Sequence, residues 1–145
     1  MKAIVSLLLF TVTAGAVTTA EAAPPRTPLL AADCINTTQI NDWHIIDAHT
    51  AIVRTGPKRY LVKLSVDCPQ LSHPPGLIFK ANQANAVVNQ GRICGEVGET
   101  VGTRGRPPCP LESVSLIDKA RFDQLTKDAK YYNGGNIKKA AAATH

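Results

Sequence analysis

The chain lacks the short motifs that identify common enzyme classes. It has no Cys-x-x-Cys pair, so a structural zinc site would need ligands from four separate segments. No serine lies in a Gly-x-Ser-x-Gly elbow, and the neighbours Ser72 and His73 are flanked by prolines, which indicates an exposed loop rather than a catalytic triad. We therefore expect no catalytic activity and no cofactor.

Aromatic residues and excess charge are also scarce. Aromatics make up 5% of the residues, and the formal net charge at pH 7 is +5. Proteins that bind single-stranded nucleic acid stack bases on aromatic side chains, and Tyr60 is the only aromatic residue near the predicted hairpin. These features argue against nucleic acid as a partner. The mild basicity is compatible with an envelope protein or an anionic envelope polymer as the partner.

The candidate binding residues are basic side chains around a predicted hairpin and in a later loop: Arg54, Lys58, Arg59, Lys63, Arg104 and Arg106. The simplest interpretation is a solvated face on which edge lysines deter aggregation. Binding of an anionic polysaccharide or a lipid head group would use the same charges.

The N-terminus has the pattern of a signal peptide. Lys2 precedes an apolar run that is strongest from Ala3 to Phe10, and residues 20–22 form an Ala-x-Ala cleavage site. We expect cleavage between Ala22 and Ala23. The run is shorter than the ~20 apolar residues of a membrane helix and is interrupted by threonines. The sequence thus predicts a periplasmic or secreted protein with no transmembrane anchor after cleavage.

The chain divides into four predicted parts. Residues 1–22 are the signal peptide, 23–33 a proline-rich leader that we expect to be extended and mobile, 34–133 a single domain, and 134–145 a disordered tail. After cleavage about 120 residues remain, which is enough for one modest core.

The four cysteines, Cys34, Cys68, Cys94 and Cys109, all follow the leader. An even number in an exported small domain predicts two disulfides. We favour the nested pairs Cys34–Cys109 and Cys68–Cys94, because the first bridge would tie the start of the domain to the segment before its last strand. The sequential pairing remains an open alternative.

The clearest element is a β-hairpin in residues 51–66. Tyr60, Val62, Leu64 and Val66 alternate with more polar positions, which predicts one buried face. Gly56 and the following proline provide the turn. Two strands are only marginally stable in water, so other elements must cover this face.

The remaining pattern predicts a mainly β domain. We expect a short helical turn within residues 34–43, and residues 43–48 running into the first hairpin strand. Further strands are expected in residues 77–79, 92–103 and 111–117, with Glu99 at a strand end. A helix capped by Asp118 should then bury Phe122, Leu125 and Ala129 and end at Gly134-Gly135. We expect a small barrel-like or curved antiparallel meander of about five strands with a C-terminal helix, stabilised by disulfides.

Several of these residues carry a resemblance to a known family: Cys34-Ile35, Ile40, Trp43, Asp47, Tyr60-Leu61-Val62, Cys68, Leu71, Ile93-Cys94 and Cys109. Over roughly residues 34–117 the chain resembles a family of small exported proteobacterial proteins known only as a domain of unknown function. The resemblance implies a periplasmic or secreted location and a small β-rich domain. It implies no activity and no functional residues.

His44, Asp47 and His49 are the candidate metal ligands. Their spacing is similar to the Asp-x-His-x-His strand of metal-dependent amidohydrolases, but Ala51 replaces the second histidine of that motif, and the chain is far shorter than the ~250 residues of a (β/α)₈ barrel. In a strand Asp47 and His49 project from one face and His44 from the other, which disfavours a shared metal.

We expect, then, a non-catalytic binding or structural protein of the bacterial cell envelope. Two alternatives remain. One is a small metal-assisted enzyme that uses His44, Asp47 and His49. The other is a secreted interaction partner or inhibitor that acts through its basic loops, with Arg104 and Arg106 at the contact.

Overall fold

A computed structural model describes residues 25–72, 76–84, 86–132 and 136–137. The predicted signal peptide, its cleavage site between Ala22 and Ala23 and most of the predicted C-terminal tail lie outside the described residues. Asn136–Ile137, within that predicted tail, forms a short strand. No helix in the described part of the chain is long and apolar enough to cross a membrane.

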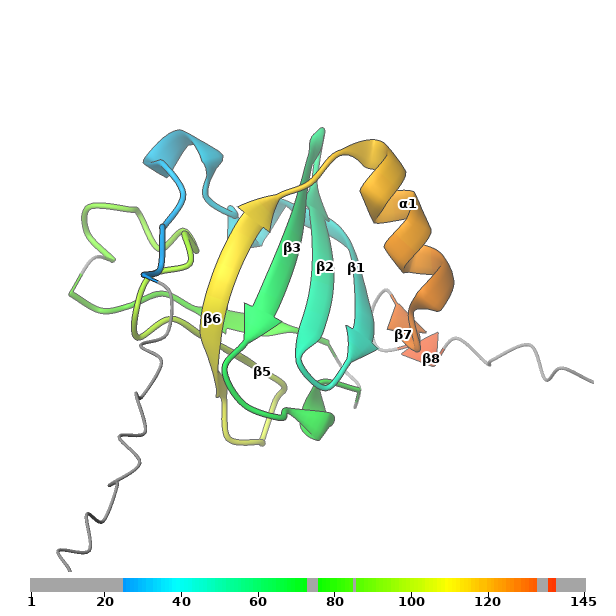
Figure 1. The fold of residues 1–145 in the computed structure, drawn as a ribbon. Helices are drawn as coiled ribbons and strands as arrows, with labels where there is room; N and C mark the ends of the chain where they lie inside the picture. Colours follow the sequence, from blue (N-terminus) through cyan, green and yellow to red (C-terminus); the bar gives the residue numbers. More distant parts are fainter. Residues whose placement is uncertain (1–24, 73–75, 85, 133–135, 138–145) are drawn as a thin grey trace, which may run out of the picture.

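The fold is a curled antiparallel sheet with one helix, as the sequence predicts (Figure 1). The elements are β1 Ile40–Asp47, β2 Thr50–Thr55, β3 Lys58–Leu64, β4 Ile78–Lys80, β5 Thr100–Gly102, β6 Cys109–Leu116, α1 Lys119–Asp128, β7 Tyr131–Tyr132 and β8 Asn136–Ile137, with short 3₁₀ turns at Ala31–Asp33, Thr37–Gln39 and Pro69–Ser72. The strand order is β4-β5-β6-β3-β2-β1-β7-β8. The chain therefore leaves β3, forms the far edge of the sheet with β4 and β5, and returns as β6 beside β3.

The predicted hairpin is β2 and β3. Thr55 pairs with Lys58, and Gly56 in the two-residue loop has a φ of 55°, a conformation that glycine adopts at little cost. Tyr60 is fully buried, as the alternation predicts. Val66, predicted to lie on the same face, is 45% exposed because β3 ends at Leu64.

Residues 43–48 do not run into the hairpin, contrary to the prediction. Residues 43–47 belong to the separate strand β1, which pairs antiparallel with β2, and Ala48 lies in the turn between the two strands. The Asp47 carboxylate accepts a hydrogen bond from the His49 backbone N–H at 2.8 Å, and this side-chain turn reverses the chain at residues 48–49. Strands β1, β2 and β3 thus form two successive hairpins.

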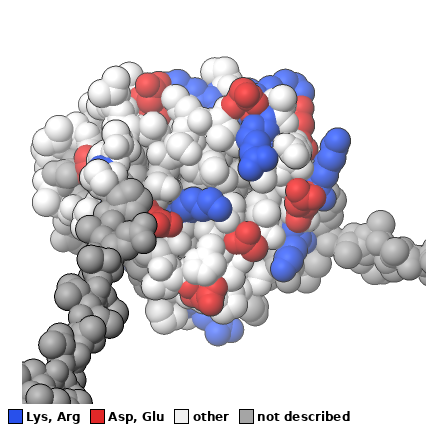
Figure 2. All heavy atoms as spheres, viewed as in Figure 1, with Lys and Arg blue, Asp and Glu red and all other residues white. Residues whose placement is uncertain are grey.

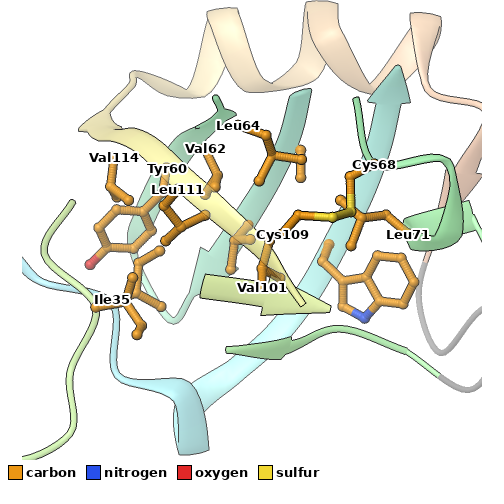
Figure 3. Packing of buried hydrophobic residues seen from close by; sticks show 14 of the residues in the cluster. Ile35, Tyr60, Val62, Leu64, Cys68, Leu71, Val101, Cys109, Leu111 and Val114 are labelled. Atoms are coloured by element: carbon orange, nitrogen blue, oxygen red, sulfur yellow. A yellow bond between two sulfur atoms is a disulfide. The ribbon is translucent and has the colours of Figure 1, made fainter. Parts of the chain in front are cut away.

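One face of the sheet carries the main core (Figure 3). Its largest fully buried members are Tyr60, Ile35, Leu64, Leu71, Ile93 and Leu111. The loops of residues 25–39 and 65–108 supply the side chains that cover the strands, which is the cover that the isolated hairpin requires. The Tyr60 hydroxyl lies 3.4 Å from the Cys34 carbonyl oxygen, so its polar end is satisfied inside the core.

The opposite face packs against α1. The Asp118 side chain accepts a hydrogen bond from the Arg121 backbone N–H at 2.7 Å, which confirms the predicted N-cap. Phe122 and Leu125 form a second buried cluster with Ile52. The prediction that the helix continues to Gly134-Gly135 is wrong. It ends at Asp128, because Ala129 takes an extended conformation and the Lys130 N–H donates to the Ile45 carbonyl, which directs the chain into β7.

The structure contains two disulfides, but both predicted pairings are wrong. The bridges are Cys34–Cys94 and Cys68–Cys109, which is the interleaved arrangement, and no described cysteine is free. Ile35 and Ile93 exchange two backbone hydrogen bonds, and this places the neighbouring Cys34 and Cys94 side by side. Cys109 begins β6, next to the exit of β3, where Cys68 reaches it.

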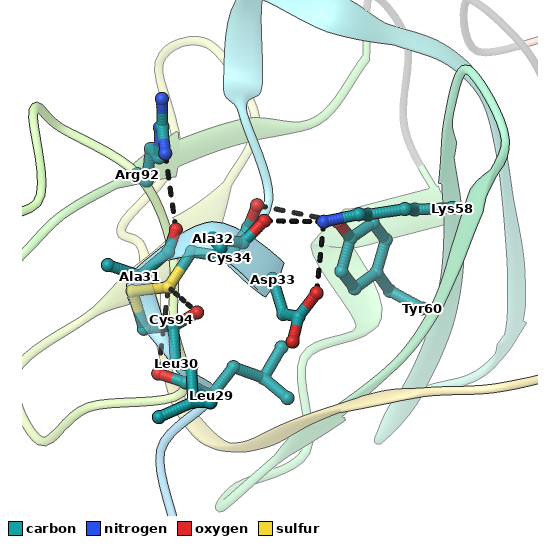
Figure 4. Close-up of polar contacts among 10 residues, drawn as sticks. All are labelled: Leu29, Leu30, Ala31, Ala32, Asp33, Cys34, Lys58, Tyr60, Arg92 and Cys94. Carbon is teal, nitrogen blue, oxygen red and sulfur yellow. Dashed lines mark hydrogen bonds and ion pairs between the residues drawn. A yellow bond between two sulfur atoms is a disulfide. The ribbon is translucent and has the colours of Figure 1, made fainter.

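The proline-rich leader lies against the domain, which differs from the expected mobile tether (Figure 4). Arg26 donates to the Leu111 carbonyl at 2.9 Å, and the Leu29 N–H donates to the Cys94 carbonyl at 2.8 Å. Lys58 holds the next turn through the Ala32 carbonyl and an ion pair with Asp33 at 3.0 Å. The described part of the leader is therefore part of the folded unit.

Glu99 is a buried structural carboxylate. It directly precedes β5, and only 1% of it is exposed. Its two carboxylate oxygens accept hydrogen bonds from the backbone N–H groups of Cys94 at 2.9 Å, Gly95 at 2.7 Å and Glu96 at 3.1 Å. Burial raises the pKa of Glu99, and the three donors offset this effect only in part. One side chain thus closes the loop that contains the Cys34–Cys94 bridge.

Candidate anion-binding site

The three candidate metal ligands do not come together. His44 is buried against the helix, where its ring packs edge-on to Phe122 with centroids 5.8 Å apart and its Nε2 lies 3.1 Å from an Asp42 oxygen. Asp47 serves the turn described above, and the half-exposed His49 ring pairs with Asp67 at 2.6 Å. No group of three or more metal-binding side chains occurs in the part of the chain that the structure describes.

The basic residues of the hairpin already have partners. The Arg54 Nε lies 3.7 Å from an Asp42 oxygen, Lys58 pairs with Asp33, and Arg59 donates to the Pro57 carbonyl at 2.9 Å. Figure 2 shows the result on one face of the molecule, where basic and acidic groups are interspersed. These predicted candidates stabilise local structure and do not form one positive surface.

The two arginines of the late loop lie in a different setting. Arg104 and Arg106 line a shallow hollow together with Lys80 of β4, and all three side chains are exposed. Ile78, Gly102, Thr103, Gly105 and Pro108 complete its wall. Among the described residues, no carboxylate lies within ion-pair distance of any of these three cations. The hollow therefore combines three positive charges that have no acidic partner among the residues that the structure describes.

The backbone brings these cations together. Lys80 pairs with Thr100 in the β4–β5 ladder, and Ile78 pairs with Gly102. A Cβ on Gly102 would come within 3.0 Å of the Pro108 backbone, so glycine permits the loop to return closely over β5. The Arg106 N–H donates to the Thr103 carbonyl at 3.2 Å and forms the turn that carries both arginines.

The arrangement suits the binding of an anion. Guanidinium groups bind carboxylate and phosphate oxygens through two parallel N–H donors, and an ammonium group adds a third charge. Sequence reasoning identified Arg104 and Arg106 but missed Lys80, which the β4–β5 pairing brings to them from more than twenty residues away along the chain.

A second polar hollow lies between α1 and the sheet. It is lined by Asp42, His44, Arg54, Arg59, Lys119, Phe122, Asp123 and Thr126. Its charges are largely paired, since Asp42 contacts both His44 and Arg54, and Lys119 donates to Asp123 and lowers the pKa of that carboxyl. The hollow at Lys80 is therefore the better candidate for an anionic ligand.

Comparison with known proteins places the chain in a family but not near a characterised relative. No curated protein and no solved structure matches it. The family model described as a family of unknown function (DUF6491) matches residues 1–133, which extends beyond the resemblance noted for residues 34–117. The chain therefore belongs to DUF6491, a family of unknown function.

Proposed function

We propose that this protein is an exported, non-catalytic binding protein of the bacterial cell envelope whose ligand carries carboxylate or phosphate groups. The observation that carries the proposal is the hollow at Lys80, Arg104 and Arg106, in which three exposed cations have no acidic partner among the described residues. The predicted signal peptide supports export. The two disulfides fit a compartment outside the reducing cytoplasm.

The physical argument rests on how exposed charges behave. A cation that already has a nearby carboxylate gains little from a second anion, whereas three unpaired cations around one hollow attract an anion jointly. Salt screens charges at such an exposed site, with a Debye length of about 8 Å at physiological ionic strength. Affinity must therefore fall as salt is added.

The experiment measures binding of the mature chain, residues 23–145, to fluorescein-labelled poly-L-glutamate and to inorganic polyphosphate, with neutral dextran as the uncharged control. Fluorescence anisotropy at increasing salt gives the affinities. The test variant is Lys80→Gln/Arg104→Gln/Arg106→Gln. The matched control, Lys119→Gln/Arg121→Gln/Lys127→Gln, removes the same number of positive charges from exposed positions on α1.

We expect the triple variant at the hollow to lose at least about tenfold in affinity, and the helix control to lose no more than about threefold through the change in net charge. The variant at the hollow should unfold at the wild-type temperature, because its three side chains are exposed. The helix control should be only slightly less stable, because the ion pair that it loses between Lys119 and Asp123 is exposed. Equal losses in both variants would mean attraction by net charge alone and would overturn the site. Absence of binding to either polyanion would overturn the proposed function.

A further inference from the structure

Strand β4 lies at an edge of the sheet. It follows β3 in the chain but occupies the far end of the strand order, and its one neighbour is β5. No second strand pairs with it anywhere in residues 25–72, 76–84, 86–132 and 136–137. Half of the backbone N–H and C=O groups of such an edge point away from the sheet, where an added strand can bind them.

The hollow lies beside this edge. Ile78 and Lys80 alternate along β4 and share one face, where both are exposed and line the hollow with Arg104 and Arg106. Phe79 lies on the other face, packed against the core. A strand added next to β4 would therefore place every second side chain on the face that carries the three cations.

We propose that the ligand is an extended acidic segment of a partner protein, which adds to the sheet beside β4 and directs alternate carboxylates toward Lys80, Arg104 and Arg106. This inference rests on the proposed function and specifies its ligand. Two features identify the occupant. The carboxylates of an acidic peptide complement the three cations, and its backbone can hydrogen-bond with the open edge of β4. A polyphosphate or an acidic polysaccharide would satisfy only the cations.

The short length of β4 explains why both contacts are needed. Three residues offer only a few ladder hydrogen bonds, and each contributes modestly once water competes. Charge-assisted contacts are the stronger ones and supply the remaining affinity. The connector that follows, residues 81–91, contains no charged residue, so an acidic segment that extends past Lys80 meets no like charge in that connector.

The probe is an acetylated and amidated heptapeptide in which glutamate and threonine alternate. The first control has the same composition, with four glutamates followed by three threonines. Two further peptides keep the alternating sequence but carry N-methyl groups, one on the second and fourth backbone nitrogens and the other on the third and fifth. In an extended peptide these two sets point to opposite sides, so only one set faces β4.

We expect the alternating peptide to bind at least about tenfold more tightly than the block peptide. One methylation pattern should abolish binding and the other should leave it nearly unchanged. Amide exchange at Ile78–Lys80 should slow in the complex. The Lys80→Gln/Arg104→Gln/Arg106→Gln variant should bind none of the peptides.

The outcomes separate the two proposals. Equal affinity for the alternating and block peptides, or equal tolerance of both methylation patterns without protection of Ile78–Lys80, would overturn strand addition. The anion site would still stand if the triple variant then lost binding to polyphosphate. Failure of the wild-type protein to bind polyphosphate, polyglutamate and every peptide would overturn both.

Discussion

The two halves of this domain are held together in different ways. In the sheet half, β1, β2, β3 and β6 are six to eight residues long and pair along most of their length. In the loop half, residues 25–39 and 65–108, the strands β4 and β5 have three residues each. The sheet half is stabilised by many similar contacts, whereas the loop half depends on a few specific ones.

Those few contacts are identifiable. The two disulfides attach the loops to each other and to β6, Glu99 closes the loop of residues 94–99, and Lys58 fastens the leader. The candidate site lies in the loop half, on β4, on the end of β5 and on the loop that leads into β6. A regular sheet thus supports an irregular region whose shape is free to serve binding.

Removal of the Cys34–Cys94 bridge should have the largest effect and should separate the two halves. The bridge spans 60 residues, and loop-closure entropy for such a separation predicts a loss of about 4 kcal/mol in the free energy of unfolding of Cys34→Ala/Cys94→Ala. Urea unfolding measures the loss, and amide hydrogen exchange locates it. Protection should fall in residues 92–99 and remain in β2 and β3.

The opposite pattern of exchange would contradict the comparison. If β2 and β3 lost protection as fully as residues 92–99, the loop half would not be a separate unit, and the domain would unfold only as a whole. Chemical reduction of the wild-type protein cannot replace the Cys34→Ala/Cys94→Ala variant in this test, because reduction opens the Cys68–Cys109 bridge as well.

The same contrast explains what the sequence could predict. Alternation at Tyr60, Val62 and Leu64 located the hairpin, and a capping residue before a periodic run located the start of α1, because both signals are local. The end of α1 was misplaced, since a tertiary hydrogen bond from Lys130 to Ile45 ends it before the glycines.

The loop half gave weaker signals because its contacts join residues far apart in sequence. The Cys34–Cys94 pairing follows from the bridge between Ile35 and Ile93, and no local pattern marks that bridge. Lys80 joins Arg104 and Arg106 only through the register of two three-residue strands. Glu99 reads as a polar strand end, although in the structure it is buried and binds three backbone donors.

A smaller change tests the sheet half from its helix side. Asp118→Ala removes the acceptor for the Arg121 N–H and should lower the free energy of unfolding by about 1 kcal/mol. Urea unfolding should measure this loss. Amide exchange should become faster at the start of α1 and should not change in residues 92–99. Asp118→Asn keeps the acceptor and should stay within a few tenths of a kcal/mol of the wild type. An equal loss in both variants would show that the negative charge of Asp118, and not its hydrogen bond with the Arg121 N–H, stabilises the helix.

The smallest expected effect concerns the pH dependence of the loop half, where burial and three hydrogen bonds act on the Glu99 carboxyl in opposite directions. Because the net effect is a raised pKa, the folded protein holds this proton more tightly than the unfolded chain does. The contribution of Glu99 to stability is therefore largest below the ordinary carboxyl pKa of about 4.3 and declines as the pH rises through the raised value.

Glu99→Gln should remove this decline. It should also lower stability overall, because an amide keeps one acceptor oxygen, and its nitrogen cannot accept from the backbone N–H groups that the other carboxylate oxygen now binds. Urea midpoints from about pH 4 to pH 8 give the slope of stability against pH for both proteins. The contributions of all other carboxyl groups cancel in the difference between the two slopes. Glu112→Gln, at an exposed position of β6, is the matched control and should leave the slope unchanged. If Glu99→Gln kept the wild-type slope, proton binding at this residue would not be linked to folding, and the closure of residues 94–99 would rest on hydrogen bonding alone.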